Sequence, residues 1–226
     1  MMNTSDVITL GSGERLAISF LGHASLAMEY AGKYIYVDPV GTFADYSDAP
    51  KADLILVTHQ HDDHLDKDLV MQLSKAGTRF ISTQTVVDEM GRGEVMKSGD
   101  ATIIGEWVGI QVMPAYNTTP GRDIFHPRDR RDNGYILSIG GTRIYIAGDG
   151  EPTPEMMALK DIDIAFLPVN QPYTMTVEQA AEAARAIKPK IFYPYHYGQT
   201  DQKTDIKKLE KLLLGSDIEV RVMPME

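Results

Sequence analysis

The spacing of apolar and polar residues predicts several strands in the first third of the chain. Arg15–Leu21, Ser25–Tyr30 and Lys33–Val37 are apolar or alternating in character, and Gly22-His23 and Ala31-Gly32 separate them with residues typical of turns. We therefore expect these three segments to form three strands.

The next segment has the pattern of a strand that is covered on both faces. Asp53–Thr58 contains a continuous apolar run, which is typical of a buried strand. Asp66 then has the position of an N-cap, because Leu69, Val70 and Leu73 follow it on one helical stripe. Further strands are predicted at Arg79–Ser82, Ala101–Ile104 and Val108–Met113.

Helices alternate with strands in the second half. Gly140-Gly141 lies between the apolar segments Gly134–Ile139 and Thr142–Ala147, which predicts a tight hairpin. Thr176 and Gln179 have the spacing of a capping box at the start of a helix. The other predicted elements are a short helix opened by Thr153-Pro154, strands at Ile162–Val169, Lys190–Tyr195 and Ile218–Met223, and a helix at Asp205–Leu213. This succession favours sheets with helices packed outside them.

The chain shows no feature that would divide it. Its 226 residues contain no repeat, no low-complexity tract and no Pro/Gly/Ser-rich linker, so we expect one domain over residues 1–226. The N-terminus lacks the pattern of a signal peptide, and the apolar runs are too short to span a bilayer. There is no cysteine, which agrees with a cytoplasmic protein.

Charge narrows the range of partners. The net charge is −10, and a chain this acidic is repelled by nucleic acid and by anionic membranes. We therefore expect a small-molecule substrate, no nucleic acid and no membrane. The oligomeric state stays open.

The strongest chemical pattern is the segment His-Gln-His-Asp-Asp-His at residues 59–64, which holds half of the six histidines. It follows directly on a predicted buried strand, at the end where open α/β folds build their sites. His59 and His61 project from one side of an extended backbone and can chelate one cation, and Asp63 and His64 can hold a second. Without cysteine, a transition-metal site must use imidazole and carboxylate, which suit Zn²⁺, Mn²⁺ and Fe²⁺.

Three more candidates lie at predicted strand ends. Asp149 lies in a Gly-Asp-Gly turn, His196 follows the strand that ends at Tyr195, and Asp38 follows the strand that ends at Val37. Asp38 is suited to orienting a metal-bound imidazole. Each of the three also has a plain structural interpretation as a turn or hydrogen-bonding residue.

Taken together, these residues resemble a known family. The His59-x-His61-x-Asp63-His64 motif, Gly148-Asp149 and the late His196 are similar to the metallo-β-lactamase fold superfamily of metal-dependent hydrolases. The segments that flank these residues are similar to one branch of the superfamily, the zinc-dependent or ascorbate-phosphate-lactonase-like hydrolases. These segments are Leu21–Ser25, Val37–Pro39, Tyr145–Asp149 and Tyr195–Gly198.

The resemblance implies an α/β (α+β) fold, a four-layer αββα sandwich with its site at one edge of two facing sheets. It implies that His59 and His61 bind one metal, that Asp149 bridges, and that a second metal is bound by Asp63, His64 and His196. The expected cofactor is Zn²⁺, one or two per chain, with Mn²⁺, Fe²⁺ or Ni²⁺ as alternatives. The expected activity is hydrolysis of a small ester, lactone, amide or phosphodiester, anionic ones included. Asp63 would also accept a hydrogen bond from the attacking water.

One position departs from the family pattern. Asn117 lies where a third histidine of the first metal is usual. Either that metal is held more loosely, or a water replaces the histidine, or His126 reaches in from the following loop; otherwise His126 faces the substrate. His23, at a Gly-flanked strand end, is a candidate for a supporting role or a purely structural one.

The loop Gly121–Asn133 is rich in both arginine and aspartate. Its arginines, Arg128 among them, would pair with an anionic substrate group or with the aspartates of the loop itself. Two rival functions remain: a metal-dependent binding or sensing protein without turnover, which the Asn117 departure supports, and a nuclease of the same superfamily, which the net charge disfavours.

Overall fold

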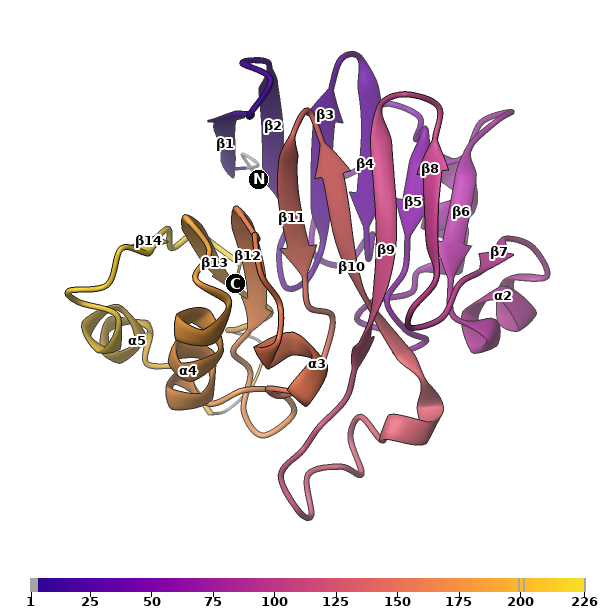
Figure 1. The fold of residues 1–226 in the computed structure, drawn as a ribbon. Coiled ribbons are helices and arrows are strands. Elements are labelled where there is room, and N and C mark those ends of the chain that lie inside the picture. Colours follow the sequence, from indigo (N-terminus) through magenta and orange to yellow (C-terminus); the bar gives the residue numbers. More distant parts are fainter. Residues whose placement is uncertain (1–3, 199, 201, 226) are drawn as a thin grey trace.

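Two sheets face each other in the computed structural model, which describes residues 4–198, 200 and 202–225 (Figure 1). The first sheet has, in spatial order, β1 (Thr4–Thr9), β2 (Arg15–Phe20), β3 (Leu26–Tyr30), β4 (Lys33–Val37), β5 (Leu54–Leu56), β6 (Arg79–Ser82) and β7 (Glu94–Val95). The second has β14 (Glu219–Val220), β13 (Ile191–Tyr195), β12 (Ile164–Pro168), β11 (Thr142–Ile146), β10 (Asp132–Ile139), β9 (Val108–Ala115) and β8 (Ala101–Ile104).

Both sheets change from antiparallel to parallel pairing along their width. Strands β1 to β4 are antiparallel neighbours, and β4 to β7 are parallel. In the same way β8 to β11 are antiparallel, and β11 to β14 are parallel. Parallel pairs need crossover connections, and these contain α1 (Lys67–Leu73), α2 (Gln84–Met90), α3 (Pro154–Met157), α4 (Val177–Ile187) and α5 (Ile206–Leu212).

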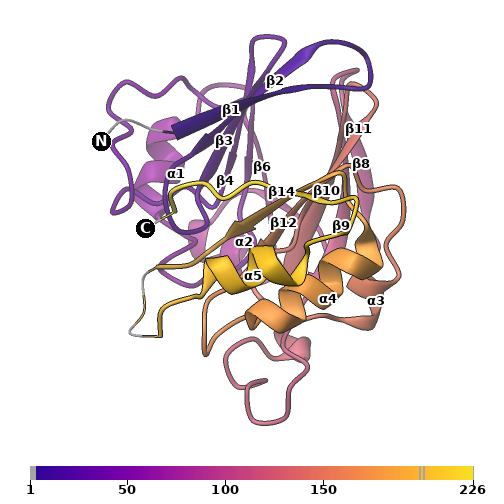
Figure 2. The ribbon, with the colours of Figure 1, turned by 90° about the vertical axis from the view of Figure 1, so that its left-hand side faces the viewer.

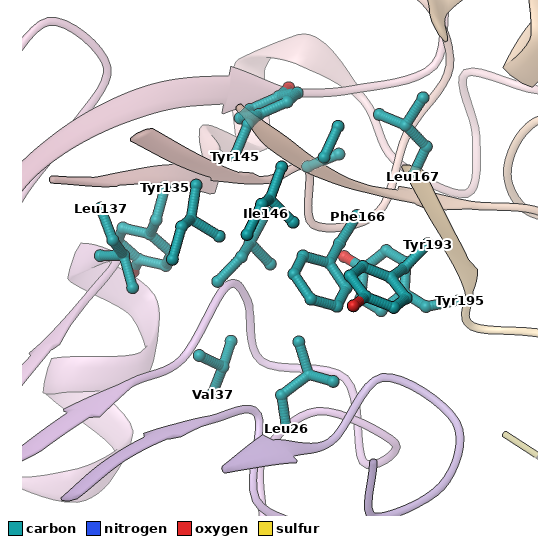
Figure 3. Close-up of a cluster of buried hydrophobic side chains, with 14 of the residues drawn as sticks. Leu26, Val37, Tyr135, Leu137, Tyr145, Ile146, Phe166, Leu167, Tyr193 and Tyr195 are labelled. Atoms are coloured by element: carbon teal, nitrogen blue, oxygen red, sulfur yellow. The ribbon is translucent and has the colours of Figure 1, made fainter. Parts of the chain in front are cut away.

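The period-two pattern of β5 explains how the layers pack. Leu54 and Leu56 point into the core between the sheets, whereas Ile55 joins a second cluster outside the sheet, together with Leu69 of α1. Figure 3 shows the core between the sheets, where Leu26 and Val37 face Phe166 and its neighbours on the second sheet.

Helices cover the outer faces. Helix α4 turns its buried alanines, Ala180 and Ala184 among them, toward the second sheet, and Figure 2 shows α3, α4 and α5 along that side. With α1 on the outer side of the first sheet, this gives the four-layer αββα sandwich expected from the resemblance. None of the helices formed by the described residues has the length and apolar character needed to cross a bilayer.

Most predicted elements are present, with small shifts at their ends. The Gly140-Gly141 hairpin, the Asp66 cap and the Thr176–Gln179 capping box are confirmed. The last predicted strand shortens to Glu219–Val220. The strands β1 and β7, helix α2 and a 3₁₀ turn at Arg128–Arg130 were not predicted.

Candidate metal centre

The ends of strands from both sheets bring all six predicted metal ligands together. His59, His61, Asp63 and His64 follow β5, while Asp149 and His196 follow β11 and β13 of the opposite sheet. Their side chains are buried, except that His61 is half-buried and Asp63 is 40% exposed.

Three residues of this region hold left-handed backbone conformations. The φ angles are 52° at His23, 45° at Asp38 and 55° at His196. Histidine and aspartate tolerate this conformation better than branched residues do, but it is uncommon for them. The chain is therefore turned sharply at the points where these side chains enter the site.

Three histidines form a first group, the imidazole trio (His59, His61 and His126). His59 Nε2 and His61 Nδ1 are 3.0 Å apart, and the ring of His126 lies 5.4 Å and 5.3 Å from the rings of His59 and His61. One nitrogen from each residue lies within 4.8 Å of the others, so all three can hold one ion.

The amide nitrogen of Asn117 is engaged with backbone carbonyls and not with this trio. This atom, Nδ2, donates to the carbonyls of Arg122 and Tyr173, both at 2.8 Å, and the backbone N–H of Asn117 donates to the carbonyl of His126. Tyr173 O also lies 3.1 Å from His126 Nδ1, which directs the other nitrogen, Nε2, toward Asp149. Of the two residues weighed for the third ligand, His126 is the one that groups with His59 and His61.

Arg122, one of the loop arginines, and Glu151, which the sequence did not single out, hold the loop that carries His126. Arg122 Nε donates to the carbonyl of Pro172 at 3.0 Å, and its Nη1 pairs with Glu151 Oε1 at 2.9 Å. The fully buried Glu151 carboxylate also accepts the backbone N–H groups of Thr118 and Thr119. Burial raises the pKa of Glu151, but these N–H donors and the Arg122 charge outweigh it and lower that pKa.

A second group, the mixed group (Asp63, His64 and His196), lies beside the trio. His64 Nε2 and His196 Nε2 are 3.0 Å apart, and Asp63 Oδ2 lies 3.8 Å from His64 Nε2 and 3.6 Å from His196 Nε2. The three residues can therefore hold a second ion.

Asp149 lies between the two groups. Its Oδ2 is 3.2 Å from His126 Nε2 of the trio, 3.4 Å from His64 Nε2 and 3.1 Å from His196 Nε2. A carboxylate in this position faces both groups at once, as a bridging ligand must.

Asp38 and Thr58 orient the imidazoles from behind. Asp38 Oδ2 lies 2.8 Å from His64 Nδ1 and accepts a hydrogen bond from the Thr58 hydroxyl, which is 3.0 Å from His59 Nδ1. With their Nδ1 atoms engaged, His59 and His64 present Nε2 to the centre. Such contacts fix the tautomer and orientation of metal-binding histidines.

His23 supports Asp63 and His196. Its Nε2 is 2.9 Å from Asp63 Oδ2, its ring lies 3.8 Å from the ring of His196, and its carbonyl accepts the backbone N–H of His196. Burial, with repulsion from His196, lowers the pKa of His23 to about 4, so it is neutral at pH 7 and donates from Nε2 to the Asp63 carboxylate.

The donor set fits divalent cations. Two nitrogens bound to one tetrahedral zinc at about 2.0–2.1 Å are about 3.3 Å apart, which is close to the 3.0 Å spacing of nitrogens in both groups. One buried atom of the centre, Asp149 Oδ1, finds no hydrogen-bond partner among the described residues. A buried carboxylate oxygen without a partner is rare, and a bound cation would supply one.

The charges around the mixed group also favour a bound cation. In the protein alone, burial lowers the pKa of His196, but Asp149 and Asp63 outweigh it and raise that pKa to about 9. The pKa of His64 is raised well above its usual value, because the carboxylates of Asp149, Asp38 and Asp63 outweigh its burial. Protonated imidazoles thus supply the positive charge that these carboxylates require, and a divalent cation would replace it.

A pocket of about 460 Å³ opens onto the centre. Its lining includes His61 and Asp63. The other lining residues include the apolar or aromatic Ile124, Phe125 and Tyr173 and the polar Arg130, Asn170 and Thr200. Arg128 does not line it: its side chain is 73% exposed and contacts Glu155 and the ring of Tyr116. Of the two arginines, Arg130 and not Arg128 lines the pocket.

Comparisons with known proteins identify the family of this chain. Residues 17–196 match a family model described as a β-lactamase superfamily domain. A UPF0173 metal-dependent hydrolase from Ligilactobacillus salivarius is 31% identical over 192 residues, which cover 80% of this chain and 85% of that protein.

Solved structures agree as well. The crystal structure of a protein assigned as a metal-dependent hydrolase from Parabacteroides distasonis has 51% identity and a TM-score of 0.94, covering 99% of this chain and 100% of that one. The metallo-β-lactamase fold protein YhfI from Bacillus subtilis shares the fold, with a TM-score of 0.72 at 10% identity over 93% and 96% of the two chains. This chain therefore belongs to the metallo-β-lactamase superfamily.

Proposed function

We propose that this chain is a metal-dependent hydrolase that uses a metal-activated water to cleave a small ester, lactone, amide or phosphodiester. The observation that supports the proposal most is the pair of ligand groups joined by Asp149 at the base of an open pocket. The relatives that match most of the chain carry the name metal-dependent hydrolase.

The residues divide between two cations, with Zn²⁺ as the proposed metal and Mn²⁺, Fe²⁺ or Ni²⁺ as alternatives. The imidazole trio would hold one, the mixed group the other, and Asp149 both. Such ions, when bound, lower the pKa of a water to about 7 and stabilise negative charge that develops on the substrate. Asp38, Thr58 and His23 keep the ligands in position through the contacts described above.

Asp63 has a second role in this proposal. The side chain of Asp63 is 40% exposed, whereas those of His64 and His196 are buried. Asp63 also lines the pocket. Burial raises its pKa, but His64, His196 and His23 outweigh that effect and lower it, so it is ionised at pH 7. It can therefore accept a hydrogen bond from the attacking water and hold that water toward the substrate.

A small substrate fits both the pocket and the charge. About 460 Å³ is within the usual range for small-molecule sites. The net charge of −10 opposes binding of nucleic acid. We propose that the substrate is a small molecule and that neither nucleic acid nor a membrane is the partner.

The test combines elemental analysis of freshly purified protein with a panel of lactones, esters, amides and phosphodiesters. We expect divalent metal in the protein and turnover of at least one class. Asp63→Ala should reduce kcat by about 10²–10⁴-fold, while Asp62→Ala, at an exposed neighbouring position, should leave it unchanged. Full activity and full metal content in Asp63→Ala would contradict the assignment of Asp63. Metal-replete protein without turnover of any class would favour the binding or sensing function instead.

A further inference from the structure

Arg130 and His61 lie in contact with each other, and both line the pocket. Arg130 is the last residue of the 3₁₀ turn, and its Nε lies 2.9 Å from both carboxylate oxygens of Asp132, whose side chain is fully buried. This contact fixes one edge of the guanidinium. Its Nη1 points the other way and lies 2.8 Å from His61 Nε2.

The two nitrogens of His61 face different neighbours. Nδ1 lies 3.0 Å from His59 Nε2, on the side of the imidazole trio, and Nε2 faces Arg130. An imidazole that gives the lone pair of Nδ1 to a cation carries its proton on Nε2. Arginine can only donate.

In the structure this contact is a hydrogen bond from Arg130 Nη1 to His61 Nε2. Once a cation takes the lone pair of Nδ1, Nε2 carries the proton and can no longer accept, and an unpaired donor in a partly buried site is costly. The side chain of Arg130 is 18% exposed, and both residues line the pocket. One oxygen of an anion that approaches from the pocket would accept from both donors of the metal-loaded protein.

We propose that Arg130 and His61 form an oxyanion subsite, and that the substrate carries a carboxylate or a phosphate beside the bond that is hydrolysed. This proposal rests on the proposed function. The carboxylate and the phosphate are alternatives of one chemistry, a planar or tetrahedral group of anionic oxygens, which guanidinium groups recognise with short, charge-assisted hydrogen bonds. Ile124, Phe125 and Tyr173, which also line the pocket, offer contacts for the remainder of the molecule.

The loop offers a matched control for Arg130. Arg128 lies two residues away and carries the same charge, but it is mostly exposed and contacts Glu155 outside the pocket. A general effect of charge would require both arginines, whereas the subsite requires only Arg130.

The test measures binding rather than turnover. Zinc-loaded protein is titrated by calorimetry with dicarboxylates of three to five carbons and with monocarboxylates of the same lengths. In both series one carboxylate can reach the metal ions, and only a dicarboxylate can also reach Arg130. We expect the best-fitting dicarboxylate to bind about 10–100-fold more tightly than its monocarboxylate partner. Organic phosphates and their unphosphorylated parents, titrated in the same way, decide which anion is preferred.

Arg130→Gln should abolish this preference, and Arg128→Gln should keep it, at equal zinc content. The double variant Arg130→Gln, Asp132→Asn guards against misfolding, because it removes both charges of the pair rather than leaving Asp132 buried alone. A wild-type protein with no preference for any dianion, or a preference that survives in Arg130→Gln, would overturn the proposal. Hydrolysis without the preference contradicts only the subsite, and the preference without hydrolysis contradicts only the proposed function.

Discussion

The two ligand groups prepare their donors in opposite ways. In the imidazole trio, burial lowers the pKa of His61 to about 4 and the pKa of His59 well below its usual value, so both rings are neutral at pH 7. In the mixed group, carboxylates outweigh burial and raise the pKa values of His64 and His196, so this pair retains a proton that a metal must displace, and the 3.0 Å between the two Nε2 atoms leaves room for one hydrogen there.

The groups also differ in how they are held. His59 and His61 of the trio follow a buried strand, but the third member, His126, depends on a loop fastened by Arg122 and Glu151. Every member of the mixed group follows the end of a strand, and Asp38 and His23 brace it from behind. The trio thus offers nitrogens that are free to bind a metal, but one of its members lies on a loop. The mixed group is held at strand ends, but it must lose a proton before its nitrogens can bind a metal.

The largest effect is expected where the groups meet. Asp149 lies within 3.4 Å of nitrogens from both groups, so Asp149→Asn should weaken metal binding by both groups. Loss of a supporting contact alone costs about 10–100-fold in metal affinity, and we expect more than that here, with a matching loss of kcat/KM. Zinc titration against a competing chelator measures it. Retention of one tight zinc would show that Asp149 serves a single group.

A smaller effect, confined to one group, is expected at His126. His126→Ala should weaken zinc binding by the trio about 100-fold and lower the metal content from two toward one, while the mixed group keeps its ion. Asn117→His in the same chain tests whether an imidazole at the position usual in the superfamily restores the ion. An unchanged stoichiometry in His126→Ala would mean that the trio does not need its loop member.

The smallest expected effect is a difference between the two groups in how metal affinity depends on pH. Because the pKa of His196 is raised to about 9, a metal that binds the mixed group at pH 7 must displace a proton, and its affinity should rise about tenfold per pH unit from pH 6 toward pH 9. The pKa of His61 is lowered to about 4, so this ring imposes no such slope above pH 5. Chelator competition at pH 6, 7 and 8 gives both slopes, and equal slopes would contradict the difference in charge.

Local signals made much of the fold predictable. The buried run at residues 54–57, the Gly140-Gly141 turn and the Thr176–Gln179 capping box are each written within a few residues, and each is present. Strand β1 was missed because all its residues but Ile8 are at least partly exposed. Helix α2 was missed because its seven residues bury only Val86 and so show no apolar stripe.

Part of the candidate site was likewise predictable from local sequence patterns, and part depends on contacts between distant segments. The four residues of the 59–64 motif lie next to one another in the sequence, and strand ends pointed to Asp38, Asp149 and His196. The choice of His126 over Asn117 depends on contacts between the loop and residues 151 and 172–174, which no local pattern reveals. The same holds for Arg130, whose direction is set by its pairing with Asp132.

The left-handed backbone at His23, Asp38 and His196 has an evolutionary consequence. Residues other than glycine cost of order 1–3 kcal/mol each in that conformation, so the protein gives up folding stability in order to aim these side chains. Glycine would relax all three turns. A library screened for melting temperature alone should therefore gather glycine at these positions and lose its metal, whereas a screen that also demands bound zinc should keep the strained residues.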